Sequence, residues 1–332
     1  MNASMKKHLA VGTLVVSACL LPRAADAQSI ASRVASVRDG KVRMSFASHD
    51  DICGWGNGIS RNSTNDSRNR SDGGRNRSED VDYDGECSEG PARVVLTLRD
   101  GKVVKIRSYV GGRWRSSSDA RDLGTVPARD AVDYLIALAN TDAGKVSSEA
   151  IFPTTLADSV DIAPRLAGIA TNESKSEDLR GHAIFWLGQT RTEDTFDQLR
   201  NLYGRIRNEG VKDKVIFAMS QQGSQESQDW LIDLASRSSE SMEIRKKALF
   251  WAGQSRAPFS RLAALYDRSR ENEMREQLIF VFSQRRESAA IDKLMDIAKN
   301  DPSRNLRRKA MFWLGQSKDA RVTAFLTDII TR

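Results

Sequence analysis

The residues able to carry acid–base or nucleophilic chemistry are few in this chain of 332 residues, which has 3 histidines and 3 cysteines. Two of the histidines, His49 and His182, lie beyond the first 27 residues. His182 stands in a repeated segment whose other copies have lysine or glutamine at that position, which is typical of a solvated surface. Because a triad or catalytic metal site needs several such groups together, the sequence predicts no catalytic residue and a protein that is not an enzyme.

One acidic run resembles part of a calcium-binding loop. Asp80, Asp82 and Asp84 alternate along the chain and Gly85 follows them, which is the spacing of oxygen ligands in the first half of an EF-hand loop. The twelfth position of such a loop needs a bidentate glutamate, but this chain has Pro91 there. Two interpretations stay open, a calcium site or an acidic surface turn, and no other cofactor is expected.

Residues 1–27 have the pattern of a cleaved export signal. Two lysines precede an apolar run over 9–21, and Ala25 and Ala27 form the small-residue cleavage site. The run is too short to cross a bilayer core of about 30 Å, so we expect no membrane span. A lipid anchor at Cys19, which ends a sequence similar to a lipoprotein processing site, is the alternative. The pattern predicts a periplasmic or secreted bacterial protein.

The cysteine pair agrees with export, and the charge bears on the kind of partner. Without residues 1–27 the chain keeps Cys53 and Cys87, and an even pair in an exported protein is most simply a disulfide. The same cleavage changes the net charge from +7 to +5. Basic and acidic residues are interspersed in the C-terminal two-thirds, so no continuous basic stripe for nucleic acid is predicted.

Residues 28–115 are expected to form a small antiparallel β domain. Asp-Gly pairs at 39–40 and 100–101 adjoin segments of alternating apolar residues, a pattern typical of β-hairpins. Between them, residues 60–80 are almost wholly polar or glycine, which predicts a disordered loop. Residues 116–125 are expected to be a linker to a helical region over 126–332.

The helical region has a repeat marked by phenylalanine. The phenylalanine recurs every 30 to 33 residues, at Phe152, Phe185, Phe217, Phe250, Phe280 and Phe312. Such a period is typical of stacked helix pairs, each of which buries its apolar face against the next. Tryptophan follows it in alternate repeats, whereas Ala218 and Val281 follow it in the others, which favours a true period of two repeats.

These aromatic residues are interpreted as the repeat core, with a ligand-binding aromatic box as the alternative. The predicted core consists of Phe185, Trp186, Phe217, Phe250, Trp251, Phe280, Phe312 and Trp313. Small residues lie three positions after each phenylalanine, where helices are expected to approach closely. They are Gly188, Ser220, Gly253, Ser283 and Gly315.

Two polar columns accompany the phenylalanines. A basic residue lies five positions before each of the last five, at Arg180, Lys212, Arg245, Arg275 and Arg307. These bases are expected to pair with acids near the preceding turns, such as Glu177, Glu209, Glu243 and Glu273, or else to bind a partner. A glutamine lies four positions after each of the same five phenylalanines, at Gln189, Gln221, Gln254, Gln284 and Gln316. The glutamines are expected to cap backbone groups in the turns, or else to line a groove.

The shared register of these columns in five copies resembles HEAT repeats, particularly the short bacterial type described in phycobilisome-lyase proteins. The resemblance covers about 128–332 and implies a right-handed α-solenoid of about six helix pairs whose concave face binds proteins. Lyase activity is not implied, because no matching catalytic residues are present.

The sequence therefore predicts a mainly α protein with a small disulfide-linked β domain before the solenoid. The function expected is a non-enzymatic extracytoplasmic scaffold that binds a protein or peptide partner on the solenoid surface. An envelope sensor or regulatory subunit with a ligand-responsive β domain is the alternative, and an envelope hydrolase that uses His49 or His182 is the third.

Overall fold

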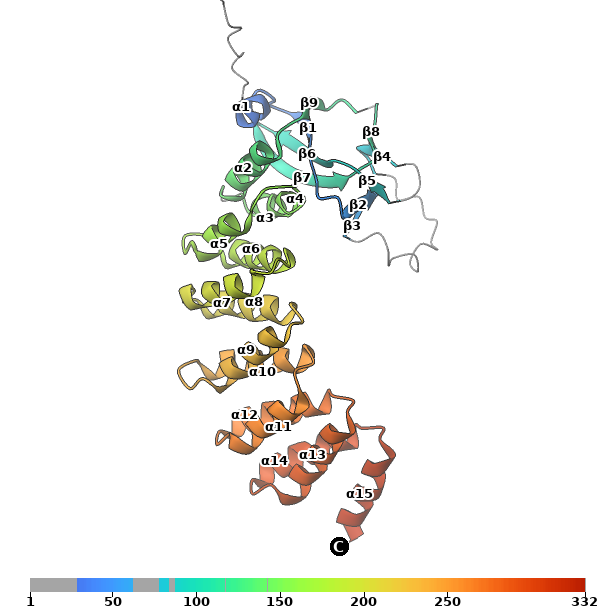
Figure 1. Ribbon diagram of the computed structural model, residues 1–332, viewed down its shortest axis with the longest axis vertical. Helices are drawn as coiled ribbons and strands as arrows, with labels where there is room; N and C mark the ends of the chain where they lie inside the picture. Colours follow the sequence, from blue (N-terminus) through green and yellow to red (C-terminus); the bar gives the residue numbers. More distant parts are fainter. Residues whose placement is uncertain (1–28, 62–77, 84–86, 117, 142, 332) are drawn as a thin grey trace, which may run out of the picture.

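The computed structural model describes residues 29–61, 78–83, 87–116, 118–141 and 143–331. The protein has a small β region at one end, and helices are stacked along the rest of its length (Figure 1). This confirms the prediction of a mainly α protein with a small β region. The predicted export signal, Cys19, Asp84 and most of the predicted loop lie outside the described residues. Within the part of the chain described, no helix has the length and apolar character needed to cross a membrane.

The β region contains one larger sheet and two smaller ones. Its strands are β1 Gly40–Phe46, β2 Ile52–Trp55, β3 Gly58–Arg61, β4 Val81–Asp82, β5 Ser88–Glu89, β6 Ala92–Arg99, β7 Lys102–Val110, β8 Arg113–Trp114 and β9 Arg121–Thr125. The larger sheet has the order β7-β6-β1-β9, with β9 parallel to β1 and the other neighbours antiparallel. The smaller sheets are β3-β2-β5 and β4-β8. The predicted disulfide between Cys53 and Cys87 is present and joins β2 to the segment before β5.

Only one of the two predicted hairpins forms. Asp100 and Gly101, both with positive φ, make the turn between β6 and β7. The first strand of the expected hairpin is missing: residues 36–39 form neither helix nor strand, and helix α1, Ile30–Ala35, precedes them, with Ser29 as the cap of its first turn and Ile30 and Val34 buried on one face. The segment at 39–40 therefore leads from a helix into β1, and the hairpin prediction there is wrong.

The segment 116–125, expected to be a linker, contains β9 and belongs to the sheet. Leu123 of β9 is buried, and the amide of Val126 donates to the carbonyl of Ser45 on β1 at 2.8 Å. One hydrophobic core continues from the sheet into the helices that follow. An isolated bridge between Ser48 and Ala157 also ties the end of β1 to the first helices. The β region and the first helices therefore pack as one body.

The helices from α5 onward alternate between two layers. After α1 they are α2 Ala128–Ala139, α3 Lys145–Glu149, α4 Ile151–Thr154, α5 Ala163–Thr171, α6 Glu177–Gln189, α7 Thr195–Arg205, α8 Glu209–Ser220, α9 Gln225–Ser236, α10 Met242–Gln254, α11 Phe259–Arg268, α12 Asn272–Ser283, α13 Ser288–Asn300, α14 Arg304–Gly315 and α15 Ala320–Thr331. Helices α6, α8, α10, α12 and α14 contact one another in sequence. We call them the even layer, and each packs against odd-numbered neighbours in the other layer (Figure 1).

Side-chain caps begin most helices of the even layer. Ser176, Asn208, Ser241 and Ser303 each accept a hydrogen bond from a backbone amide in the first turn. These caps satisfy amides that have no partner inside the helix. The exception is α12, where Glu271 precedes the helix and its carboxylate binds Arg245 of the repeat before.

The phenylalanines predicted as the repeat core lie outside the buried core of the even layer, whereas the predicted tryptophans, Trp186, Trp251 and Trp313, pack partly buried against it. The side chains of Phe185 and Phe312 are 38% and 58% exposed, and the remaining predicted core aromatics are half-buried. The residue before each of the first four phenylalanines of these helices is fully buried instead. These residues are Ile184, Ile216, Leu249 and Ile279, each 0% exposed. A step of one residue turns a helix by about 100°, so the aliphatic residue faces the other layer and the phenylalanine lies at its edge.

Candidate functional site

The displaced aromatic residues form a row along the even layer. Phenylalanine rings contact a tryptophan two helices further along the chain in three places, and the first of these phenylalanines comes from α4. The ring centroids are 4.7 Å apart for Phe152–Trp186, 4.9 Å for Phe217–Trp251 and 5.3 Å for Phe280–Trp313. Phe250 also stacks on Phe280 at 6.3 Å. We call Phe152, Phe185, Trp186, Phe217, Phe250, Trp251, Phe280, Phe312 and Trp313 the aromatic row.

The contacts confirm the predicted period of two repeats. Each of the three tryptophans contacts the phenylalanine two helices earlier in the chain. The small residue in a tryptophan-containing repeat faces a small or β-branched residue in the next one. A Cβ on Gly188 would lie 3.0 Å from the Cβ of Ala218, and a Cβ on Gly253 would lie 2.6 Å from a methyl carbon of Val281. The expectation of close helix approach is confirmed at these two positions.

Three residues of the basic column link consecutive repeats. The ammonium of Lys212 lies 3.0 Å from Glu240, Arg245 binds Glu271 at 2.8 Å, and Arg275 pairs with Asp301. Their partners precede the following even helix and differ from the predicted acids, which lie in the first turn of the same helix as the base. The other two side chains donate to backbone carbonyls, Arg180 to Ala170 at 2.8 Å and Arg307 to Asp301 at 2.6 Å. All five bases of the column are therefore engaged inside the solenoid, which favours the structural interpretation.

Fewer side chains of the glutamine column form hydrogen bonds within the protein. Gln221 and Gln284 donate to the hydroxyls of Ser220 and Ser283 at 3.2 and 3.1 Å. Within the described residues, no hydrogen bond involves the side chains of Gln189, Gln254 and Gln316. The bonds that join neighbouring turns come from the next residue along the chain, because Gln222 reaches the carbonyl of Gly188 and Arg285 that of Gly253. Capping and groove lining by the glutamine column both stay predictions.

The acidic run predicted as a calcium site is used differently in the structure. Asp80 is 2% exposed, and its carboxylate accepts from Lys41 at 2.8 Å, Arg107 at 3.1 Å and Tyr109 at 2.9 Å. Burial raises the pKa of Asp80, but these three hydrogen bonds more than offset it and hold the pKa below its ordinary value. Asp82 pairs with Arg115.

Two cations and a hydroxyl thus occupy the position that calcium would take at Asp80. Among the residues described, no group of three or more histidine, cysteine or acidic side chains lies together as metal ligands would. Asp84 lies outside those residues, so the prediction for the whole run is untested. The geometry at Asp80 favours a structural ion-pair network.

A pocket of about 740 Å³ lies where the β region meets the first repeats. Three parts of the chain form it: the segment from β1 through β3, the segment from α4 to α5, and the end of α6 with the turn that follows and the start of α7. Hydrogen bonds hold the first two together, because the amide of His49 donates to Leu156 at 3.2 Å and that of Asp158 donates to Ala47 at 3.0 Å. Residues distant in the sequence therefore share one wall.

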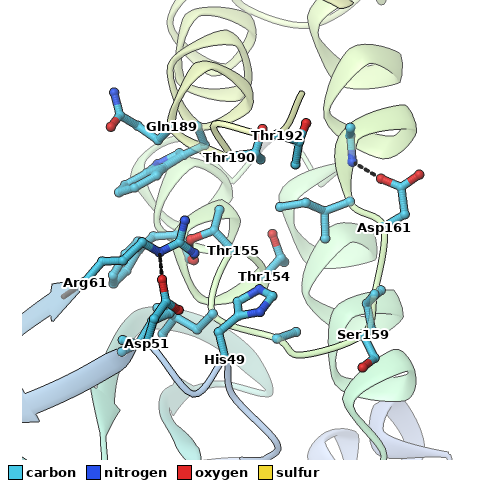
Figure 2. A pocket seen from close by; sticks show the side chains of 18 of the residues that line it. His49, Asp51, Arg61, Thr154, Thr155, Ser159, Asp161, Gln189, Thr190 and Thr192 are labelled. Atoms are coloured by element: carbon cyan, nitrogen blue, oxygen red, sulfur yellow. Dashed lines mark hydrogen bonds and ion pairs between the residues drawn. The ribbon is translucent and has the colours of Figure 1, made fainter. Parts of the chain in front are cut away.

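The lining of this pocket is mixed. Figure 2 shows Gln189 and the Arg61–Asp51 pair on one side, Asp161 and Ser159 on the other, and threonines between them. Phe152 and Trp186, the first contact of the aromatic row, line the pocket too. The first glutamine of the glutamine column and the start of the aromatic row thus meet in one cavity. The sequence separates these residues from 49–61 by about ninety positions or more, so their meeting was not predicted.

The two histidines lie in different surroundings. His182 is exposed on α6, as expected. His49 lines the pocket, and its Nδ1 lies 3.7 Å from a carboxylate oxygen of Asp158. That distance is too long for a hydrogen bond, so the pair has the attraction of opposite charges only when the imidazole is protonated.

Comparison with known proteins gives little further information. No protein-family model matches the chain, and no curated protein matches it. Solved structures that match include YibA from Escherichia coli, with 18% identity, 60% of this chain and 77% of that chain covered, and a TM-score of 0.37. Human deoxyhypusine hydroxylase in complex with glycerol matches with 15% identity, the same coverages of 60% and 77%, and a TM-score of 0.27. At these identities and scores the likeness assigns neither a family nor an activity to this chain.

Proposed function

We propose that the chain is a non-enzymatic, extracytoplasmic interaction scaffold of the HEAT-like class, and that it binds a protein or peptide partner along the even layer. The observation that supports this function is the aromatic row. Large apolar rings that remain partly exposed along one side of a solenoid are typical of interaction sites, because their burial by a partner removes apolar area from water. The glutamine column beside the row gives the same surface amide groups for hydrogen bonding.

Site-specific photocrosslinking tests this proposal. A benzoylphenylalanine replaces Phe312 or Phe185 in the row, and in a matched control it replaces Ala264, which is exposed on α11 in the other layer. The proposal predicts one discrete adduct in the native envelope from the two row positions and none from the control. The same adduct must weaken when Phe280→Ser interrupts the row. Equal labelling from both layers, or labelling indifferent to Phe280→Ser, would contradict the scaffold.

A sensor is the second candidate function, and the pocket is the observation that favours it. A small molecule bound there would contact both the β region and the first repeats, so its binding energy would depend on how the two parts sit together. Its test is whether a pocket ligand changes the yield of the Phe312 adduct. A saturated pocket with an unchanged adduct yield would remove the sensor and leave the scaffold untouched.

A further inference from the structure

We infer that the pocket between the β region and the first repeats is a binding site for a short neutral saccharide. Its volume of about 740 Å³ lies within the range of small-molecule sites, roughly 300 to 1,000 Å³. The inference is independent of the scaffold function and gives the sensor, the second candidate, its ligand class.

The aromatic wall fits one face of a sugar ring. The ring centroids of Phe152 and Trp186 lie 4.7 Å apart with 35° between the ring planes, so one ring lies partly over the other in a tilted stack, and a ligand meets the outer face of that stack. The face of an aromatic ring is electron-rich. The carbon-bound hydrogens on one face of a pyranose ring are weakly positive and poorly hydrated, so they pack well against such a surface.

The hydroxyl side chains of the pocket are arranged to accept hydrogen bonds. The hydroxyl of Thr155 donates to the carbonyl of Phe152 at 2.8 Å, and that of Thr190 donates to Leu187 at 2.7 Å. Each hydroxyl hydrogen is therefore directed into its own helix. The lone pairs of Thr155 remain for a donor, whereas the oxygen of Thr190 also lies 3.3 Å from the hydroxyl of Thr195 and keeps one lone pair for a ligand. A ligand rich in hydroxyl groups supplies such donors.

Gln189 complements these acceptors. Its amide has a donor and an acceptor side by side and, within the described part of the chain, makes no side-chain hydrogen bond. Two neighbouring hydroxyls of a sugar match that pair, since one can donate while the other accepts. Gln189 belongs to the same α6 helix as Trp186, so the amide and the indole come from one rigid element.

The charges of the pocket favour a neutral ligand. The guanidinium of Arg61 is paired with Asp51 at 3.4 Å, and one carboxylate oxygen of Asp161 accepts from the amide of Ala163 at 3.0 Å. The pocket also has Asp194, so carboxylates outnumber the single guanidinium. An anionic ligand would meet net repulsion. The carboxylate oxygens that do not bind Arg61 or the backbone can accept hydrogen bonds from uncharged hydroxyls.

Calorimetric titration of the purified full-length protein tests the inference. The probes are cellobiose, maltose and N,N′-diacetylchitobiose, with N-acetyl-lysine amide as a cationic competitor. We expect one of the saccharides to bind, and we expect Trp186→Ala and Gln189→Ala each to raise its Kd about tenfold or more. Trp186→Tyr keeps a ring at this position and guards against misfolding of the alanine variant.

Matched controls come from the repeat two units along. Trp251→Ala and Gln254→Ala remove the same residue types at the same repeat positions, outside the pocket, and should leave the Kd unchanged. The inference is overturned if none of the three saccharides binds, if the lysine derivative binds more tightly than they do, or if the controls weaken binding as much as the pocket variants. Saccharide binding without any change in the Phe312 adduct would support the inference and remove only the sensor function.

Discussion

Arg245 on α10 binds the carboxylate of Glu271, which precedes α12, and the same side chain also binds the end of α9. Its Nη1 donates to Glu271, just before α12, at 2.8 Å, and its second terminal nitrogen binds the other carboxylate oxygen. Its Nε donates to the carbonyl of Ala235 at the end of α9 at 3.1 Å. One guanidinium therefore connects both layers of its own repeat with the start of the next repeat.

Replacement of Arg245 by methionine should destabilise the protein by about 1–3 kcal/mol, because the carbonyl of Ala235 loses its hydrogen-bond partner inside the protein. Urea unfolding followed by circular dichroism measures the effect. Lys246→Ala is the control, since Lys246 pairs with Glu243 on the exposed surface of the same helix. The control should be nearly neutral, and equal losses for the two variants would refute the role of Arg245 as a link.

Adjacent residues of α10 separate the core from the aromatic row. Leu249 is 0% exposed, so Leu249→Ala should cost about 2–5 kcal/mol. Phe250 is half-buried and contacts Trp251 and Phe280, so Phe250→Ala should cost about 0.5–1.5 kcal/mol for each aromatic contact, and less in total than Leu249→Ala. Thermal unfolding of both variants gives the order. A larger loss of stability for Phe250→Ala than for Leu249→Ala would show that the phenylalanine, and not the leucine, is the core residue.

The close approach of α10 and α12 gives a prediction with an internal control. Gly253→Ala should destabilise the protein, because the new methyl group would lie 2.6 Å from a methyl carbon of Val281. Gly315 holds the same repeat position on α14, where a Cβ would meet nothing within 4 Å. Gly315→Ala should therefore be neutral or stabilising by up to about 1 kcal/mol, since alanine favours helix. Chemical unfolding measures the stability of both variants. Equal changes in stability for Gly253→Ala and Gly315→Ala would contradict the prediction.

The repeat architecture could be predicted because it follows from local spacing. The recurring phenylalanine, the alternating tryptophan and the cysteine pair each carry information that does not depend on distant contacts. The position of the core could not be read from the same pattern. Both Leu249 and Phe250 are apolar, and only packing against the second layer determines which of two adjacent residues is buried.

Long-range contacts account for the other differences. Strand β9 pairs with β1, which lies about eighty residues earlier, and the amide of Val126 donates to Ser45 of β1. The segment expected to be a linker is therefore part of a sheet. The pocket likewise depends on the bridge between Ser48 and Ala157. No local pattern specifies such a pairing, because its energy comes from residues that meet only after folding.

The network around Asp80 predicts how stability depends on pH. The folded-state pKa of Asp80 lies below its ordinary value, so the carboxylate contributes stability above the unfolded pKa of about 3.9, and this contribution is lost as the pH falls through the folded pKa. Asp80→Asn should therefore cost about 1.5–3 kcal/mol at neutral pH, the range for hydrogen bonds to a charged group. The difference between the parent protein and the variant should shrink below about pH 4. Urea unfolding from pH 7 to pH 3 measures it, with Asp50→Asn, an exposed aspartate of the same region, as the control. A difference that stays constant over this range would show that the Asp80 carboxylate is not the source of the stability.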